Sequence, residues 1–276
     1  MDVRGSLVCV GTGMMLGAHL GPRARRHIEQ ADVVFAAVSD PLVELWLQQM
    51  HPDVRSLQPL YSQERSRRDT YADMVETLLA QVRAGKRVVG AFYGHPGVFA
   101  RAPHVAIERA RAEGYEASME PGISAEDCLY ADLGIDPGTF GCQHYEASQF
   151  MLFQRRIDPS AYLILWQVGL AGDRSLRRTH TTPAERQLLV DLLAADYPLD
   201  HPVIAYEAAT LPITQVRRDP LKLGELAQAR LEPYTTLVVP PCRPLQPNLA
   251  LREKLAALAP QETATTTSAT VPSAIS

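Results

Sequence analysis

The sequence is poor in cysteine, and its few cysteines are not spaced for metal binding. Four are present, Cys9, Cys128, Cys142 and Cys242, without a Cys-x-x-Cys pair. Structural zinc sites need closely spaced ligands, and small disulfide-stapled secreted domains are richer in cysteine. The eight histidines are also dispersed, so we expect no catalytic metal and a reduced, cytoplasmic protein.

The sequence also lacks a positive charge excess and a long apolar run. Its 27 basic and 31 acidic residues give a net charge of -4, which supplies no surface for tracking phosphates and argues against a nucleic-acid partner. No segment is long and apolar enough for a signal peptide or a membrane span. What is present is 276 residues that are 46% apolar, enough to fill the core of one large domain or two small ones.

Apolar runs and helical patterns alternate along the first 120 residues. Predicted strands cover Ser6–Val10, Asp32–Val38, Val88–Phe92 and Tyr115–Met119. Predicted helices cover Arg25–Ala31, a segment from Asp69 or Thr70 to Gly85, and Val105–Ala112 between Pro103 and Gly114. This alternation favours an α/β fold with a largely parallel sheet.

The pattern changes after Glu120-Pro121-Gly122, where further apolar runs are separated by long connectors. These runs are Tyr162–Trp166, Val203–Glu207 and Thr235–Val239. We therefore predict an N-terminal α/β subdomain over 1–120, a C-terminal α/β subdomain over 121–245, a short helix over 246–260 and a flexible tail over 261–276. The tail is rich in Thr, Ala and Ser and too poor in bulky apolar residues to fold alone.

The segment Tyr93-Gly94-His95-Pro96-Gly97-Val98-Phe99 directly follows the predicted strand Val88–Phe92. In parallel α/β sheets ligands bind outside the carboxyl ends of the strands. Two glycines let the main chain approach a ligand closely, and the proline fixes one dihedral angle. The alternative is an ordinary strand-to-helix turn, which glycine and proline also mark.

A second loop runs from Glu120 to Asp127 and leads into a helix that starts near Ser124. Its position is that of a second ligand-binding loop. Ser124 followed three residues later by Asp127 is equally the signature of a helix cap.

A third group consists of Tyr61 and the run Arg67-Arg68-Asp69-Thr70-Tyr71. On a helix, Arg67 and Tyr71 are four residues apart and share one face. A guanidinium within about 4–6 Å of a phenol favours the phenolate and lowers its pKa by roughly 1–3 units. The alternative is that Arg67 and Arg68 form a solvated charge run and that Tyr71 is a half-buried helix residue.

Gly11-Thr12-Gly13, the segment YGHPGVF and the junction EPGISAEDCLYADLGIDP together resemble the tetrapyrrole methylase superfamily over roughly residues 5 to 245. The resemblance implies a two-domain α/β tetrapyrrole methylase-like fold that binds S-adenosylmethionine in the cleft between the domains. It also implies a homodimer.

Within that superfamily, RRDTY, AFYGHPGVFA and PGISAEDCLYADLGIDP resemble the borosin peptide α-N-methyltransferases. The catalytic set that this resemblance implies is Tyr61, Arg67, Tyr71 and Tyr93. Tyr71, with its pKa lowered by Arg67, is the expected base, and Tyr61 and Tyr93 are expected to steady the oxygen of the deprotonated amide. The implied cofactor contacts are His95, Pro96, Val98, Phe99, Ser124, Ala125, Gln167, Tyr206 and Thr236.

The expected reaction is repeated methylation of backbone amides in a precursor of a ribosomal peptide natural product, with S-adenosylhomocysteine as the second product. About thirty residues follow Pro240-Pro241, too few for the clasp and precursor parts of fused borosins. We therefore expect the split form, in which two enzymes and two separate precursor peptides make a heterotetramer.

Three alternatives stay open at the level of sequence. One is a tetrapyrrole C-methyltransferase acting on a uroporphyrinogen or precorrin, although GTGMMLG replaces the usual Gly-Pro-Gly-Asp stretch and His95 stands where those enzymes often have Asp. Another is a binding protein without turnover, against which the intact tyrosine–arginine set argues. The last is self-methylation of the tail, prompted by Val271 and Ile275.

Overall fold

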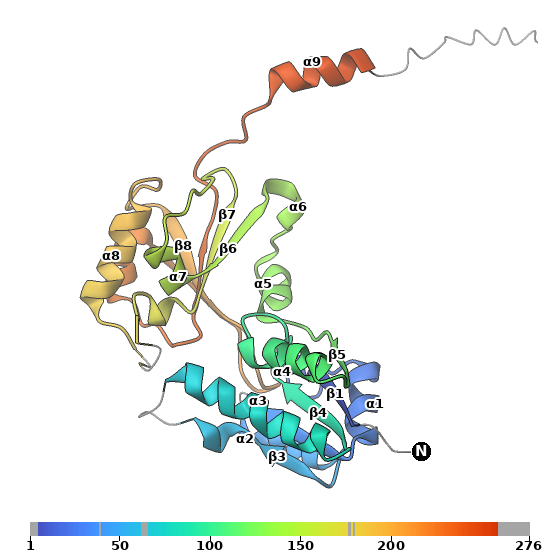
Figure 1. The fold of residues 1–276 in the computed structure, drawn as a ribbon. Helices are drawn as coiled ribbons and strands as arrows, with labels where there is room; N and C mark the ends of the chain where they lie inside the picture. The colour runs from blue at the N-terminus through green and yellow to red at the C-terminus, as the bar shows by residue number, and fades with distance from the viewer. Residues whose placement is uncertain (1–4, 39, 62–65, 176–177, 179, 259–276) are drawn as a thin grey trace, which may run out of the picture. The chain divides into compact units, whose positions relative to one another are not determined.

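Two five-stranded sheets make up the core of the protein (Figure 1). The computed structural model describes residues 5–38, 40–61, 66–175, 178 and 180–258. Both sheets belong to one compact unit, Met1–Arg243, and a second unit comprises Pro244–Ser276. No helix in the described part of the chain is long and apolar enough to cross a membrane.

The first sheet is entirely parallel, in the strand order β3-β2-β4-β1-β5. Its strands are β1 (Ser6–Gly11), β2 (Val33–Ala37), β3 (Val54–Ser56), β4 (Arg87–Phe92) and β5 (Glu116–Glu120). The helical segments of this half are α1 (Pro22–Gln30), α2 (Pro41–Gln48), η1 (Gln58–Leu60), α3 (Arg67–Arg83) and α4 (Arg101–Ala112). The largely parallel sheet predicted for this half is confirmed.

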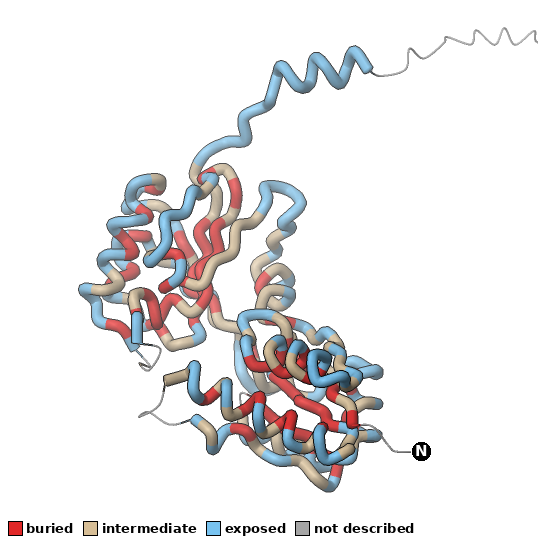
Figure 2. The backbone as a smooth tube through the Cα atoms, in the orientation of Figure 1, coloured by how far each residue is buried: buried red, intermediate tan, exposed pale blue. Residues whose placement is uncertain are grey.

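Helices cover both faces of the first sheet, so its central strands are apolar on both sides (Figure 2). Leu7 and Cys9 of β1 pack with residues of α3 and α4 on one face. Val10 packs with residues of α1 and α2 on the other face. The carboxyl ends of these strands therefore meet at one edge, where their loops are free to form a site.

The second sheet is mixed, in the order β6-β7-β10-β8-β9, and only β6 and β7 pair in parallel. Its strands are β6 (Cys142–Glu146), β7 (Tyr162–Trp166), β8 (Pro202–Glu207), β9 (Arg217–Lys222) and β10 (Thr236–Val239). The helical segments of this half are α5 (Ala125–Leu133), α6 (Pro137–Phe140), α7 (Ala147–Leu152), η2 (Val168–Leu170), α8 (Pro183–Leu193) and η3 (Leu223–Gln228). Separate apolar clusters lie on its two faces, one with α7, α8 and η3 and one with α5.

Three helices begin earlier than predicted, and the first of them, α1, begins at Pro22 instead of Arg25. α3 begins at Arg67, because Ser66 caps it by accepting a hydrogen bond from the backbone N–H of Asp69. The prediction that Pro103 bounds α4 is wrong, since the helix begins at Arg101 and Pro103 lies in its first turn, where proline is tolerated. The strands β3, β6 and β9 were not predicted.

The predicted domain boundaries remain predictions. The first sheet ends at Glu120 and the second begins at Cys142, but both lie in one compact unit. A helix, α9 (Leu249–Leu258), lies within the predicted 246–260 segment. The predicted tail, 261–276, lies outside the described residues.

Candidate functional site

The positions of all four predicted catalytic residues follow from how the first half folds. Tyr93 is the residue after β4, at the carboxyl edge of the sheet. Arg67 and Tyr71 lie four residues apart at the start of α3. Tyr61 directly follows η1, the short helix before the segment that leads into α3. The fold thus brings the ends of three separate elements to this edge.

Electrostatic interactions join these four side chains. Loss of hydration raises the pKa of Tyr61 above its usual range. The charges of Tyr71 and Tyr93 and a hydrogen bond with Tyr71 raise it further, and the charge of Arg67 opposes the shift. Loss of hydration likewise raises the pKa of Tyr93, with the charge of Tyr71 adding to the shift and Arg67 opposing it. The structure therefore places Tyr61, Arg67, Tyr71 and Tyr93 together. The predicted role of Tyr71 as the base stays a prediction.

A cavity of about 390 Å³ opens beside Arg67 and Tyr71. The Nη2 of Arg67 donates a hydrogen bond to the carbonyl oxygen of Arg178 at 3.1 Å, which holds the guanidinium near the second half of the chain. The cavity is lined by Arg67, Arg68, Tyr71, Arg101, Glu146, Ser148, Gln167, Leu170 and Asp173. It therefore joins the first turns of α3 and α4 to residues at the ends of β6 and β7.

Main chain packs directly against main chain where β1, β4 and β5 end. A Cβ added to Gly122 would meet the carbonyl oxygen of Gly94 and the backbone of Gly11. Gly13 and Gly94 exchange backbone hydrogen bonds of 3.1 and 2.9 Å. Gly94 has φ 62°, in the left-handed region that glycine adopts without strain. Only glycine fits this contact, and it fixes where the loop after Tyr93 begins.

The rest of that loop is a tight turn. The backbone N–H of Gly97 donates to Nδ1 of His95 at 2.8 Å, and that of Val98 donates to the carbonyl oxygen of His95 at 3.2 Å. Pro96 is buried, whereas Val98 and Phe99 are exposed. The turn thus presents the apolar side chains of Val98 and Phe99 outward on a rigid backbone.

Two residues of the predicted cofactor site are strained. Phe99 (φ 49°) and Gln167 (φ 58°) are the non-glycine residues with positive φ in the described part of the chain. Such conformations cost roughly 1–3 kcal/mol and concentrate at functional sites. The ring of Phe99 lies 5.6 Å from that of Trp166, the residue before Gln167. The strained positions therefore lie close together although they are far apart in sequence.

Ser124 caps α5, as its sequence signature also allowed. The backbone N–H of Ser124 donates to Oδ2 of Asp127 at 2.7 Å, and the N–H of Asp127 donates to Oγ of Ser124 at 3.3 Å. The capping interpretation is confirmed. It leaves the predicted cofactor contact of Ser124 and Ala125 untested.

Tyr206 and Thr236 are buried neighbours in the second sheet. They are register partners on β8 and β10, and Tyr206 donates from its hydroxyl to a carboxylate oxygen of Asp132 at 2.7 Å. Neither residue lines the cavity described above. Their predicted contact with a cofactor stays a prediction.

A polar network that sequence patterns did not predict begins at Trp166, whose ring contacts that of Phe99. Trp166 Nε1 donates to Nδ1 of His144 at 3.3 Å, so the proton of the neutral imidazole is on Nε2. That nitrogen lies 2.9 Å from the hydroxyl of Tyr130, which in turn donates to Glu126 at 2.9 Å. Burial lowers the pKa of His144, and the charge of Glu126 opposes the shift.

Sequence reasoning also missed Arg101, Glu146, Ser148, Leu170 and Asp173, and it left Arg68 as a surface charge. One available signal was an arginine at the start of a helix, where the helix dipole favours acidic residues. In the described part of the chain, no group of three or more His, Cys, Asp or Glu residues lies close enough to hold a metal ion.

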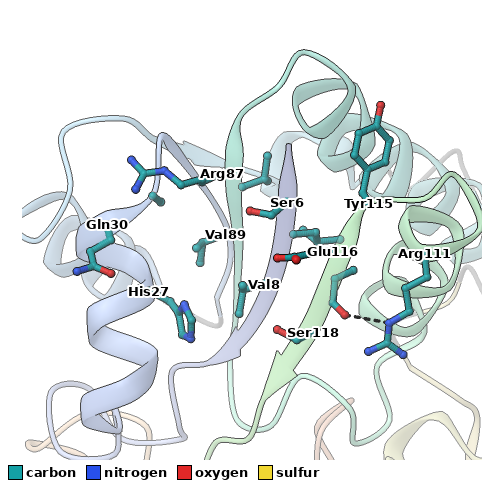
Figure 3. A pocket seen from close by; sticks show the side chains of 14 residues that line it. Ser6, Val8, His27, Gln30, Arg87, Val89, Arg111, Tyr115, Glu116 and Ser118 are labelled. Atoms are coloured by element: carbon teal, nitrogen blue, oxygen red, sulfur yellow. Dashed lines mark hydrogen bonds between the residues drawn. The ribbon is translucent and has the colours of Figure 1, made fainter. Parts of the chain in front are cut away.

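A larger hollow, of about 610 Å³, lies at the opposite end of the first sheet (Figure 3). It is bordered by Ser6, Arg87 and Glu116, at the amino ends of β1, β4 and β5. Arg87 is paired there with Asp32 at 2.7 Å. Because ligands of parallel sheets bind at the carboxyl ends of the strands, the smaller cavity beside Tyr71 is the candidate site.

Comparison with known proteins agrees with this geometry. A methyltransferase and type I borosin cyclic peptide precursor from Coprinopsis marcescibilis is 41% identical over 87% of this chain and 63% of its own. The methyltransferase and omphalotin A precursor of Omphalotus olearius is 38% identical over 91% of this chain and 61% of its own. The chain thus spans less than two thirds of these relatives. The predicted resemblance to borosin methyltransferases is confirmed.

The fold and the family follow from two further matches. The crystal structure of uroporphyrin-III-C-methyltransferase from Thermus thermophilus superposes with a TM-score of 0.62 at 21% identity, covering 86% of this chain and 93% of that one. This match confirms the predicted two-domain α/β fold. The profile of the Tetrapyrrole (Corrin/Porphyrin) Methylases matches residues 6–224, and the chain belongs to that family.

Proposed function

We propose that this methyltransferase methylates backbone amide nitrogens of a precursor peptide, repeatedly, with S-adenosylmethionine as methyl donor. We further propose that the peptide is a separate chain, and that two copies of it bind an enzyme homodimer to form a heterotetramer. The observation that carries it is the cluster of Tyr61, Arg67, Tyr71 and Tyr93 beside the cavity. The names of the relatives, which combine a methyltransferase with a cyclic peptide precursor, support it.

The cluster suits a substrate that must lose a proton before it can react. A peptide nitrogen is a poor nucleophile because its lone pair is delocalised into the carbonyl group. Tyr71 is the proposed base, and the guanidinium of Arg67 favours its phenolate. The N–H proton passes to the oxygen of Tyr71, and the resulting negative charge moves onto the amide oxygen.

The other two tyrosines suit the complementary role. A phenol with its usual pKa of about 10 is already protonated at neutral pH, and the raised pKa values of Tyr61 and Tyr93 make loss of that proton still less favourable. A neutral phenol is a hydrogen-bond donor, and preorganised donors stabilise the charge that develops on an oxygen. One tyrosine of the cluster therefore takes the proton while the other two hold the oxygen.

The residues present fit the methyl donor. The strained turn at Phe99, the exposed apolar side chains of Val98 and Phe99, and the strained Gln167 form an apolar, backbone-lined surface of the kind that binds a nucleoside. When bound, S-adenosylmethionine supplies a sulfonium methyl that needs no activation and leaves S-adenosylhomocysteine. The residues proposed to hold it are His95, Pro96, Val98, Phe99, Ser124, Ala125, Gln167, Tyr206 and Thr236. Their task is to align nitrogen, methyl carbon and sulfur.

The test is co-expression with a small open reading frame encoded beside the gene, followed by fragment mass spectrometry of the peptide. Methyl groups located on backbone nitrogens support the proposal, and we expect Tyr71→Phe to abolish them while S-adenosylhomocysteine binding persists. Methylation of a uroporphyrinogen instead of the peptide would overturn it.

Intact-mass measurement of the protein expressed alone tests the separate-peptide part. Methyl-sized additions to its own tail, near Val271 and Ile275, would show self-modification instead. A sedimentation measurement with and without the peptide tests the homodimer and the heterotetramer.

A further inference from the structure

The cavity beside Tyr71 is lined by more positive charge than the proposed chemistry uses. Arg67, Arg68 and Arg101 all border it. Arg67 belongs to the tyrosine cluster and bonds the carbonyl oxygen of Arg178. In the part of the chain that the structure describes, Arg68 and Arg101 have no hydrogen bond or ion pair. Two guanidiniums therefore face the cavity without a partner.

The two carboxylates of the cavity do not neutralise these arginines. Glu146 accepts hydrogen bonds from the backbone N–H groups of Ser148, at 3.0 Å, and Gln149, at 2.6 Å, and so caps α7. Asp173 is 5% exposed, and its Oδ1 accepts from the N–H and the hydroxyl of Ser175 at 2.8 and 2.7 Å. Each carboxylate is held by its own turn. Three guanidiniums against two carboxylates leave a surplus positive charge.

Local folding does not account for the two unpaired arginines. Arg68 and Arg101 lie in the first turns of α3 and α4, where the helix dipole disfavours a positive side chain. α4 has no acidic residue in its first turn that would offset Arg101. In α3 Asp69 lies beside Arg68, but neither helix end gives a reason for a positive charge, and both arginines are exposed and so open to a ligand.

We propose that Arg68 and Arg101 bind a carboxylate of the peptide substrate and thereby select which amide reaches Tyr71. The inference rests on the proposed function and names a specificity determinant for it. Guanidiniums bind carboxylates through paired, charge-assisted hydrogen bonds, which fix position as well as affinity. The carboxylate comes either from an acidic side chain or from the peptide's C-terminus.

The spacing on α3 limits where that carboxylate lies in the peptide. Arg68 and Tyr71 are three residues apart, which is close to one helical turn, or roughly 5 Å along the axis. An extended peptide advances about 3.3 Å per residue. We therefore expect the bound acidic group within about three residues of the amide that is methylated.

The probes are fluorescein-labelled peptides of Val, Ala and Gly that carry one Glu or the matched Gln, each with a free or an amidated C-terminus. Binding is measured by fluorescence anisotropy in the Tyr71→Phe background, so that turnover is not needed. We expect removal of the recognised carboxylate to weaken binding by about tenfold, as for other charge-assisted hydrogen bonds. If the Glu and Gln peptides differ in affinity, the recognised carboxylate is the side chain. If the free and amidated peptides differ, it is the C-terminus.

The variants Arg68→Ala and Arg101→Ala are expected to remove that tenfold preference while leaving the affinity for the carboxylate-free peptide nearly unchanged. Arg111→Ala, on the last turn of α4 and outside this cavity, is the matched control and should keep the preference. S-adenosylhomocysteine affinity should be the same in all variants. Equal binding of all peptides, or a preference that persists without both arginines, would overturn the inference, as would loss of S-adenosylhomocysteine binding in the arginine variants.

The outcome is separable from that of the proposed function. A carboxylate preference that depends on Arg68 and Arg101 supports the subsite even if methyl groups are later found on another atom. Backbone methylation without any such preference retains the function and rejects the subsite.

Discussion

The two sheets contribute to the candidate site in different ways. The parallel sheet supplies exposed side chains from loops and helix starts, such as Tyr61 at 45% and Tyr93 at 53% exposure. The half that contains the mixed sheet lines the cavity with less exposed residues such as Glu146 and Gln167, which adjoin buried strand residues such as Trp166 at 6% exposure. Residues that are free to act on a substrate are therefore concentrated in the first half, and those that hold the architecture in the second. Substitutions in the two halves should differ in whether they change activity or folding.

The largest expected effect separates activity from folding in the first half. Arg67→Ala should lower methylation by about 100-fold or more, because the proposed base loses the charge that favours its phenolate. Thermal unfolding should change little, since among the described residues Arg67 makes one hydrogen bond, to Arg178. Initial rates and a melting curve measure the two effects.

Arg67→Lys is the matched variant, and it should retain part of the rate because it keeps the charge without the fork. A wild-type rate in Arg67→Ala would remove the assigned role.

A matched pair of glycine substitutions sharpens the comparison. A Cβ at Gly122 would meet the carbonyl oxygen of Gly94 in the first half, and one at Gly169 would meet that of Glu232 in the second. Each change to Ala should destabilise the fold by about 1–3 kcal/mol, as overpacking does. Gly122→Ala should weaken S-adenosylhomocysteine binding more than Gly169→Ala does, because it displaces the turn that carries Val98 and Phe99, whereas Gly169 lies in η2 beside the cavity residue Leu170.

Denaturant titration and isothermal calorimetry measure these two quantities. Equal loss of ligand affinity in both variants would remove the distinction between the halves.

Gln167→Gly should have opposite effects on folding and on binding. Gln167 has φ 58°, so glycine relieves strain and should stabilise the fold by up to about 1 kcal/mol. The same change removes a side chain that lines the cavity and should weaken ligand binding. A stability gain without a loss of affinity would mean that the strain at this position does not serve the site.

The smallest expected effect is a pH dependence in the second half. Burial lowers the pKa of His144 in the fold, so in mildly acidic solution the unfolded chain binds a proton that the folded protein resists. Stability should therefore fall as the pH drops below the usual histidine range, about 6.5, and be independent of this group above it. His144→Gln should flatten that slope in melting curves recorded across the range. An unchanged slope would mean that other titratable groups cause the pH dependence of stability.

Strands with continuous apolar sequence could be predicted, whereas three of the four edge strands, β3, β6 and β9, could not; the fourth, β5, was predicted to within a residue at each end. β7 was predicted with its observed bounds, Tyr162–Trp166, because buried strands carry uninterrupted bulky residues. β9 was missed because the sequence of an edge strand can be charged and contain proline, as RRDPLK does. β6 was missed because CQHYE is partly buried throughout and shows no alternation.

The candidate site divides in the same way. Tyr93 and Arg67 could be placed because each stands next to a recognisable strand end or helix start. Arg101, Glu146 and Asp173 could not, because their meeting in one cavity depends on how distant segments pack. Local sequence patterns predict which residues lie at strand ends and helix starts. They do not predict which of these residues meet in one cavity.

The contact among Gly11, Gly94 and Gly122 has a consequence for redesign. A surface made of backbone peptide groups keeps the same shape and the same dipoles when the side chains around it are exchanged. If Arg68 and Arg101 select the peptide as proposed, they can therefore be replaced to accept new peptides without rebuilding the part of the protein proposed to hold the methyl donor. Donor and acceptor recognition would then be separable modules within one small protein.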